Sequence, residues 1–249
     1  MEITPHVKDL TARVIDTLLP PQSLITGSLE TGGIESELWA QVKFLDEPCC
    51  HMCGFPFEYD EGAKALCGRC SVKRPAYDMA RAGFEYDDHS RPLVLGFKHG
   101  GRTEGLHMFA SHMRRAGRLC LDGADFLVPV PLHYKRRIKR RYNQSALLAR
   151  ALAKISAPIF DPDILERTRS TPSQGGRSAS GRRRNVQGAF RVRDTALDRL
   201  QGSKVVLIDD VMTTGATLES CARTLKRAGA KQVTALTLAR VVKAATLPT

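Results

Sequence analysis

The chain has 249 residues, of which 42% are hydrophobic and 26% are charged, and these fractions are typical of a soluble globular protein. Its 38 Lys and Arg residues outnumber 26 Asp and Glu residues, giving a formal net charge of +12. We therefore expect either a polyanionic partner or a basic surface that is simply solvated. The sequence contains no apolar run of about 18 residues and no apolar signal-peptide core, which predicts a cytoplasmic protein without a membrane span. The length allows one large domain, or one domain and a small module.

The first stretch with a clear period covers residues 3 to 19, where apolar residues recur at helical spacing. Thr4 and Pro5 suit a first helical turn and Pro20 ends it, so an amphipathic helix is predicted. Residues 22 to 48 show no period and contain several glycines, which is typical of turns.

Two cysteine pairs of the form C-x2-C follow, separated by thirteen residues. This spacing is typical of a structural Zn²⁺ site in which four thiolates bind one ion. The predicted ligands are Cys50, Cys53, Cys67 and Cys70. A disulfide or plain buried thiols are the alternatives, and the neighbouring Cys49 or His51 could replace a ligand. Cys120 and Cys221 lie on apolar faces of predicted helices, so we expect both to be core residues.

The middle of the chain predicts a helix, a strand and a second helix. Residues 72 to 90 predict a linker helix, and the apolar run from Leu93 to Phe97 predicts a strand within residues 91–98. A basic, glycine-rich turn, FKHGGR, occupies residues 97–102. Residues 103 to 119 carry apolar residues at helical spacing and predict a helix.

The segment FLVPVPL, residues 126–132, predicts the first strand of the main sheet. Its prolines indicate an edge strand, or a strand that ends in an irregular loop. A basic run at residues 135–141 contains six Lys or Arg in seven residues, and Asn143 then caps a predicted helix that ends near Ile155. Residues 167 to 188 are aperiodic and rich in Arg, Ser and Gly, which predicts a long loop of the kind that often carries function.

The sequence VVLIDDVMTTGAT, residues 205–217, combines a strand, two acids and a turn. Its first four residues predict a strand buried on both faces, as in a parallel sheet. Asp209 and Asp210 follow at the carboxyl end, where ligands bind in open α/β sheets, and adjacent carboxylates suit vicinal hydroxyls or Mg²⁺. The hydroxylated turn around Gly215 leads into a helix from Thr217 and presents N–H groups to a phosphate. The pattern indicates a sugar phosphate site; the alternative is a structural turn in which both acids only cap the helix.

Residues 232 to 241 predict one more strand. Together the elements predict an α/β fold, with a parallel sheet and crossover helices preceded by a small zinc module.

Residues 205–217 resemble the 5-phosphoribosyl-1-pyrophosphate (PRPP) signature of type I phosphoribosyltransferases. The resemblance implies a sheet of that type and PRPP as substrate, bound together with Mg²⁺. It implies that Asp209 and Asp210 hold the ribose hydroxyls and act as catalytic acids that stabilise an oxocarbenium-like sugar. The implied contacts to the PRPP phosphates are Leu132, His133, Thr213, Thr214, Gly215, Ala216 and Thr217.

A wider set of features resembles the ComF family: the C-x2-C pairs, the FKHGGR turn, VPVPLH with the basic run and Asn143-Gln144, and RRRNVQGAF at residues 182–190. Some members of that family carry a second cysteine ribbon, whereas residues 1–48 here contain no cysteine. We therefore expect a single zinc ion and a degenerate, metal-free ribbon. The expected domains are residues 1–48 with a helix and this ribbon, residues 49–80 with a zinc-ribbon-like module, and residues 81–249 with the phosphoribosyltransferase-like domain.

The ComF resemblance implies a role in DNA uptake during natural transformation, with single-stranded DNA and the competence helicase or uptake machinery as partners. The candidate DNA-binding residues are Lys135, Arg136, Arg137, Arg140, Arg141, Arg182, Arg183 and Arg184. Tyr134, Tyr142 and Phe190 are the aromatic candidates for base stacking. Two functions stay open: a PRPP-dependent transferase, including one of nucleotide metabolism without a nucleic-acid role, and a module that binds PRPP and DNA without turnover. No residue identifies the acceptor of a transfer.

Overall fold

The computed structural model of the chain describes residues 39–99, 105–132, 142–169 and 188–242. Its contacts divide the chain into two compact units, one of residues 1–42 and 88–105 and one of residues 43–87 and 106–249. The smaller unit contributes helix α4 (Arg91–His99), and the larger one contains the sheets. Within the described ranges, no helix is both long enough and apolar enough to cross a membrane.

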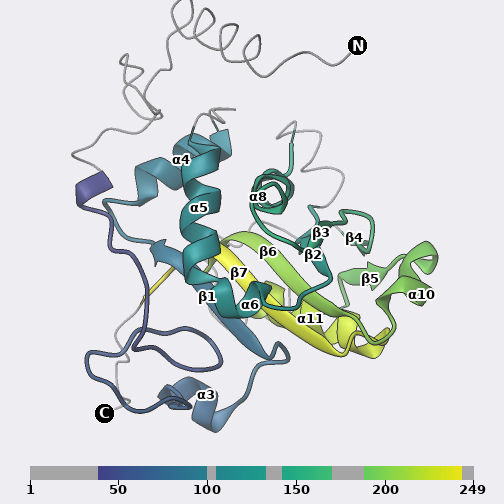
Figure 1. Cartoon of the computed structure of the whole chain (residues 1–249), viewed down its shortest axis with the longest axis horizontal. Coiled ribbons are helices and arrows are strands. Elements are labelled where there is room, and N and C mark those ends of the chain that lie inside the picture. Colours follow the sequence, from purple (N-terminus) through teal and green to yellow (C-terminus); the bar gives the residue numbers. More distant parts are fainter. Residues whose placement is uncertain (1–38, 100–104, 133–141, 170–187, 243–249) are drawn as a thin grey trace, which may run out of the picture. The chain divides into compact units, whose positions relative to one another are not determined.

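Five parallel strands form the main sheet in the order β1-β7-β6-β2-β3 (Figure 1). Their bounds are β1 Met79–Glu85, β2 Phe126–Pro129, β3 Ile159–Phe160, β6 Lys204–Met212 and β7 Gln232–Arg240. Val206 of the central strand β6 is in register with Leu127 on one side and with Thr234 on the other. The four residues from Val205 to Ile208 are at most 1% exposed, so this strand has no polar alternation because both of its faces are covered. The predicted parallel α/β sheet is confirmed.

Different helices cover the two faces of this sheet (Figure 1). Helix α11 (Ala216–Arg227) buries Leu218 and Leu225 in one core cluster with Val205 and Leu207, the alternate residues of β6. Helices α5 (Leu106–Ala116) and α8 (Gln144–Ala153) contact each other, and they pack over β1 and β7 and over β2 and β6 respectively. The short helix α6 (Arg118–Leu121) contacts β1 and β7.

A second, two-stranded sheet was not predicted from the sequence. Strands β4 (Leu165–Arg167) and β5 (Phe190–Val192) are antiparallel, and β5 contacts α11. A 3₁₀ turn, η1 (Asp194–Ala196), and helix α10 (Leu197–Leu200) follow. These two strands flank the long loop predicted at residues 167–188, of which residues 170–187 lie outside the described ranges.

The linker helix predicted at residues 72–90 is wrong, because this segment contains strand β1. Small residues such as Ala80, Ala82 and Gly83 favoured a helix in the sequence. In the structure they allow close packing: a Cβ atom on Gly83 would lie 3.0 Å from the carbonyl oxygen of Leu238 in β7. Tertiary packing therefore overrides local helix propensity.

The strand predicted around Leu93 to Phe97 is also wrong, because these residues lie in helix α4. Pro92 is in its first turn, where the missing N–H is no loss, and the N–H of Val94 donates to the carbonyl of Ser90 at 3.2 Å. Five consecutive apolar or glycine residues do not distinguish a strand from a buried helix.

Strand β2 is neither the first strand in the chain, as predicted, nor an edge strand, because it lies between β6 and β3. The other interpretation of its prolines is confirmed: the strand ends at Pro129, and the N–H of Val130 makes a last bond of 2.9 Å to the carbonyl of Ile208. Asn143 caps α8 as predicted.

Several predicted features lie outside the described residues. They are the helix at residues 3–19, the cysteine-free ribbon up to residue 38, the glycines of the FKHGGR turn, His133 and Tyr134, the basic run at 135–141, and Arg182, Arg183 and Arg184.

Candidate functional site

Four thiols come together in the larger unit, and they are the four predicted ligands. The Sγ atoms of Cys50, Cys53, Cys67 and Cys70 all lie within 4.8 Å of one another, and those of Cys53 and Cys67 are 3.6 Å apart. Four sulfurs around a tetrahedral Zn²⁺ at about 2.3 Å would be about 3.8 Å apart. The cluster therefore has the donor set and the spacing that a zinc ion needs.

Backbone turns hold these thiols in place. The N–H of Gly54 donates to the carbonyl of Cys50 at 2.8 Å, and the N–H of Cys70 donates to that of Cys67 at the same distance. Cys70 lies on the short helix α3 (Gly68–Val72). Within the described ranges, Cys49 does not belong to the group of four.

The thiols also perturb one another, as expected for a site that binds a cation. The pKa of Cys50 is lowered to about 4, chiefly because the Cys53 thiol hydrogen-bonds to its thiolate. The pKa of Cys70 is raised to about 12, chiefly by burial. A second and third thiolate are therefore costly without a positive charge between them, and a divalent ion would supply that charge.

The first knuckle is fixed to the main sheet. The carbonyl of Met52 accepts a bond of 2.7 Å from the N–H of Ala80 in β1, and the carbonyl of Cys53 accepts one from the guanidinium of Arg240 at the end of β7. The cysteine cluster and the sheet therefore form one continuous structure within the larger unit.

The paired acids lie near the carboxyl end of β6, where the sequence placed them. Both are partly buried. Ser145 Oγ donates to Asp209 Oδ1 at 2.9 Å, and the Asp210 N–H donates to the same oxygen at 2.9 Å. Asn143 accepts from the Ser145 N–H and donates to the carbonyl of Val130, both at 3.1 Å. The end of β2, the start of α8 and the acids are thus tied together, and Ser145 is a site residue that sequence reasoning missed.

The loop after β6 turns sharply at Gly215, which is the N-cap of α11 and has φ +72°. A Cβ atom there would lie 3.0 Å from the Met212 methyl group and 3.3 Å from the Tyr77 hydroxyl. Residues Asp209, Thr213 and Thr217 line one small hollow with a volume of about 30 Å³ together with the backbone of Gly215 and Ala216. The amino end of a 12-residue helix at this hollow favours an anion.

The remaining predicted PRPP contacts are placed less completely. Asp210 and Thr214 are beside the hollow in sequence but are not among the residues that line it. Leu132 lies three residues beyond the end of β2 and is partly buried.

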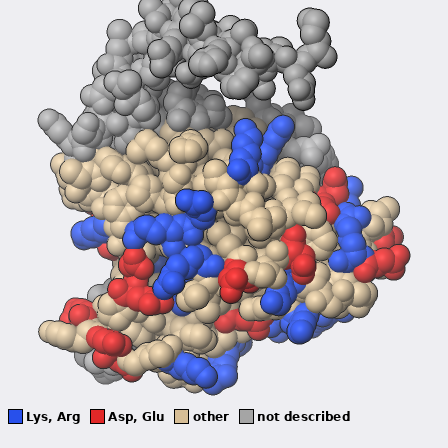
Figure 2. All heavy atoms as spheres, in the orientation of Figure 1, with Lys and Arg blue, Asp and Glu red and all other residues tan. Residues whose placement is uncertain are grey.

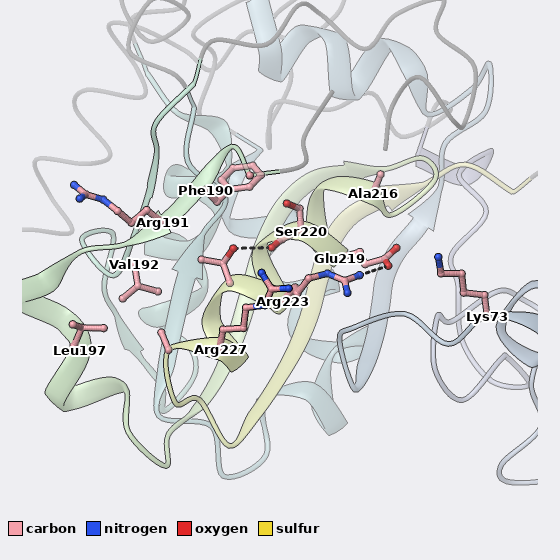
Figure 3. A pocket seen from close by; sticks show the side chains of 13 residues that line it. Lys73, Phe190, Arg191, Val192, Leu197, Ala216, Glu219, Ser220, Arg223 and Arg227 are labelled. Atoms are coloured by element: carbon pink, nitrogen blue, oxygen red, sulfur yellow. Dashed lines mark hydrogen bonds and ion pairs between the residues drawn. The ribbon is translucent and has the colours of Figure 1, made fainter. Parts of the chain in front are cut away.

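A larger groove, with a volume of about 680 Å³, runs along α11 (Figure 3). Its charged lining residues are Lys73, Arg191, Glu219, Arg223 and Arg227, four cations and one acid, and it begins at Ala216 beside the phosphate loop. Glu219 pairs with Arg223 at 2.8 Å. The sequence could not reveal this groove, because its cations come from three separate segments.

The groove does not offer an aromatic stacking face through Phe190. That side chain lines the groove but is only 7% exposed, and the Arg167 guanidinium lies 5.2 Å from its ring centroid. On the face drawn in Figure 2, Lys and Arg side chains alternate with Asp and Glu, so that face is not uniformly basic.

The parallel sheet, the acids at the end of β6 and the loop that caps α11 define a phosphoribosyltransferase-type domain. The family model for the phosphoribosyl transferase domain matches residues 124–247. Over 58% of this chain and 30% of the other, the fold is compared with a solved structure titled as the allosteric regulatory enzyme of purine biosynthesis, with a TM-score of 0.37 and 16% identity.

Curated relatives give the particular family. The chain is 33% identical to the DNA utilization protein YhgH of Escherichia coli over 204 residues, which is 79% of this chain and 86% of that one. It is 29% identical to competence protein F of Haemophilus influenzae, over 84% of this chain and 90% of that one. The chain therefore belongs to the ComF family, as the sequence features indicated.

Proposed function

We propose that this protein binds PRPP with Mg²⁺ at the carboxyl end of β6 and binds single-stranded DNA, in a pathway of DNA uptake or use. The observation that carries the PRPP proposal is the placement of Asp209, held by Ser145, in the same hollow as the loop that caps α11. A carboxylate for ribose hydroxyls and a helix amino end for a phosphate are the two features a ribose 5-phosphate group requires.

The residues at this site have distinct roles in the proposal. Asp209 and Asp210 accept hydrogen bonds from the ribose hydroxyls and stabilise positive charge that develops on the sugar ring. The N–H groups and hydroxyls from Thr213 to Thr217 hold the 5′-phosphate. Ser145 fixes the orientation of Asp209. The Mg²⁺ ion would neutralise charge on the pyrophosphate group, and carboxylate oxygens are suitable ligands for it.

The DNA proposal rests on the names of the relatives and on the charge of the chain. One relative is named for DNA utilization and another for competence. Residues 133–141 and 170–187 contain Lys and Arg but no Asp or Glu, and the groove along α11 adds four cations among the described residues. Buried Phe190 leaves the groove without a stacking platform, so backbone contacts and weak sequence preference are expected.

The cysteine cluster is proposed to hold one structural Zn²⁺. Its four sulfurs have the required spacing, and cysteine-only donors select zinc or iron–sulfur chemistry over Mg²⁺.

Calorimetry with Mg²⁺–PRPP, and fluorescence anisotropy with a labelled oligonucleotide over a salt series, test the two halves separately. We expect PRPP binding, and DNA binding whose logarithmic salt slope is about −0.7 for each phosphate contacted. PRPP binding without any DNA binding at low salt would favour the alternative, a transferase of nucleotide metabolism. Pyrophosphate release from labelled PRPP that depends on an added acceptor would show turnover; its absence with tight binding would leave a binding module.

A further inference from the structure

The second cysteine knuckle reaches the proposed phosphate loop through Arg69. This residue lies between the predicted ligands Cys67 and Cys70, and its guanidinium donates to the carbonyl oxygen of Thr214, 145 residues further along the chain. Thr214 directly precedes Gly215, the N-cap of α11. A charged donor on a backbone carbonyl fixes the orientation of that peptide group and places a positive charge beside the loop.

A second residue of the same segment contacts the loop independently. Tyr77 is 2% exposed, and its hydroxyl is 3.3 Å from the position that a Cβ atom on Gly215 would take. A buried aromatic ring cannot move aside easily, so Tyr77 limits the conformations open to Gly215. Arg69 and Tyr77 therefore hold two consecutive residues of the turn.

The cysteine cluster connects these contacts to the sheet. The first knuckle is fixed to β1 and β7, as described above. The second knuckle joins the first through the four thiols and through a backbone bond of 2.9 Å from His51 N–H to the carbonyl of Ala65. Helix α3, which carries Arg69, has only five residues and no side-chain cap, so it has little stability of its own.

We propose that Arg69 is a positioning residue for the phosphate loop, and that a metal ion in the cysteine cluster keeps it in place. Metal occupancy would then set the affinity for a phosphorylated sugar, although the cluster itself touches no substrate. This inference rests on the proposed PRPP function of the loop.

The first test measures PRPP affinity and zinc content in full-length variants. Arg69→Met removes the donor and its charge, whereas Arg74→Met removes one cation from an exposed position in the same segment and serves as the control. We expect Arg69→Met to bind PRPP about fivefold more weakly with unchanged zinc content, Arg74→Met to match the wild type, and Arg69→Lys to recover part of the loss. Equal affinities for Arg69→Met and Arg74→Met would overturn the proposal.

The second test does not need PRPP and separates this inference from the proposed function. Amide hydrogen exchange is compared for zinc-loaded protein, chelator-treated protein and zinc-loaded Arg69→Met. We expect both altered samples to exchange faster at residues 213–217, while residues 144–149 at the start of α8 stay unchanged. Unchanged exchange in the loop after loss of the metal would overturn the link even if PRPP binds; faster exchange without PRPP binding would retain the link and refute the PRPP function.

Discussion

Gly215 provides a test of the phosphate loop in which backbone strain and site geometry can be separated. Gly215→Ala places a side chain at φ +72°, and its Cβ atom would meet the Met212 methyl group and the Tyr77 hydroxyl. Gly202→Ala is the matched control, because Gly202 has φ +69° and nothing within 4 Å of its Cβ position. The left-handed conformation costs an alanine about 1 to 2 kcal/mol in either variant.

Both variants should therefore lose about 1 to 2 kcal/mol of unfolding free energy, which lowers the melting temperature by about 2 to 8 °C in a domain of this size. Only Gly215→Ala should also lose PRPP affinity, by at least about fivefold, because the loop must shift away from the buried Tyr77 ring. Thermal unfolding and calorimetry on the same samples measure the two effects. Wild-type affinity in folded Gly215→Ala protein would refute the assignment of this turn to the phosphate.

Three further predictions concern the metal, the other thiols and the groove. Purified protein should contain about one equivalent of zinc with sulfur-only ligation, and Cys67→Ser should lose it; X-ray absorption of metal-replete protein without a metal–sulfur shell would contradict this. In zinc-loaded protein, Cys120 and Cys221 should resist thiol reagents at pH 8, because burial raises the pKa of Cys120 to about 11 and that of Cys221 well above its usual value; rapid labelling of either by mass spectrometry would be inconsistent with their burial. Replacing Lys73 and Arg227 together by Met should flatten the salt dependence of DNA binding by roughly one unit of slope; an unchanged slope would place the DNA elsewhere.

The parts of the structure that the sequence predicted well are those encoded by adjacent residues. The strand, acids and turn of residues 205–217 form one local signal, and the structure brings Asp209, Thr213 and Thr217 to one hollow. The two C-x2-C pairs likewise predicted a four-thiol cluster. The Asn143 cap required only its own helix.

The features that were missed depend on contacts between distant residues. Strand β1 is a strand because β7 pairs with it, and Gly83 fits close against Leu238. Ser145 became a site residue only when α8 was placed beside β6. Likewise, no local pattern around Arg69 indicates that its side chain reaches Thr214.

The most direct test of the central claim is calorimetry of Mg²⁺–PRPP binding to the wild type and to the double variant Asp209→Asn, Asp210→Asn. Both acids are partly buried near the end of β6 rather than in its fully buried segment, so the double variant should stay folded, as circular dichroism can verify. We predict that it loses at least about tenfold in PRPP affinity, because the amides cannot replace the charge and acceptor capacity of the carboxylates. Unchanged affinity in folded double variant would contradict a PRPP site at the carboxyl end of β6.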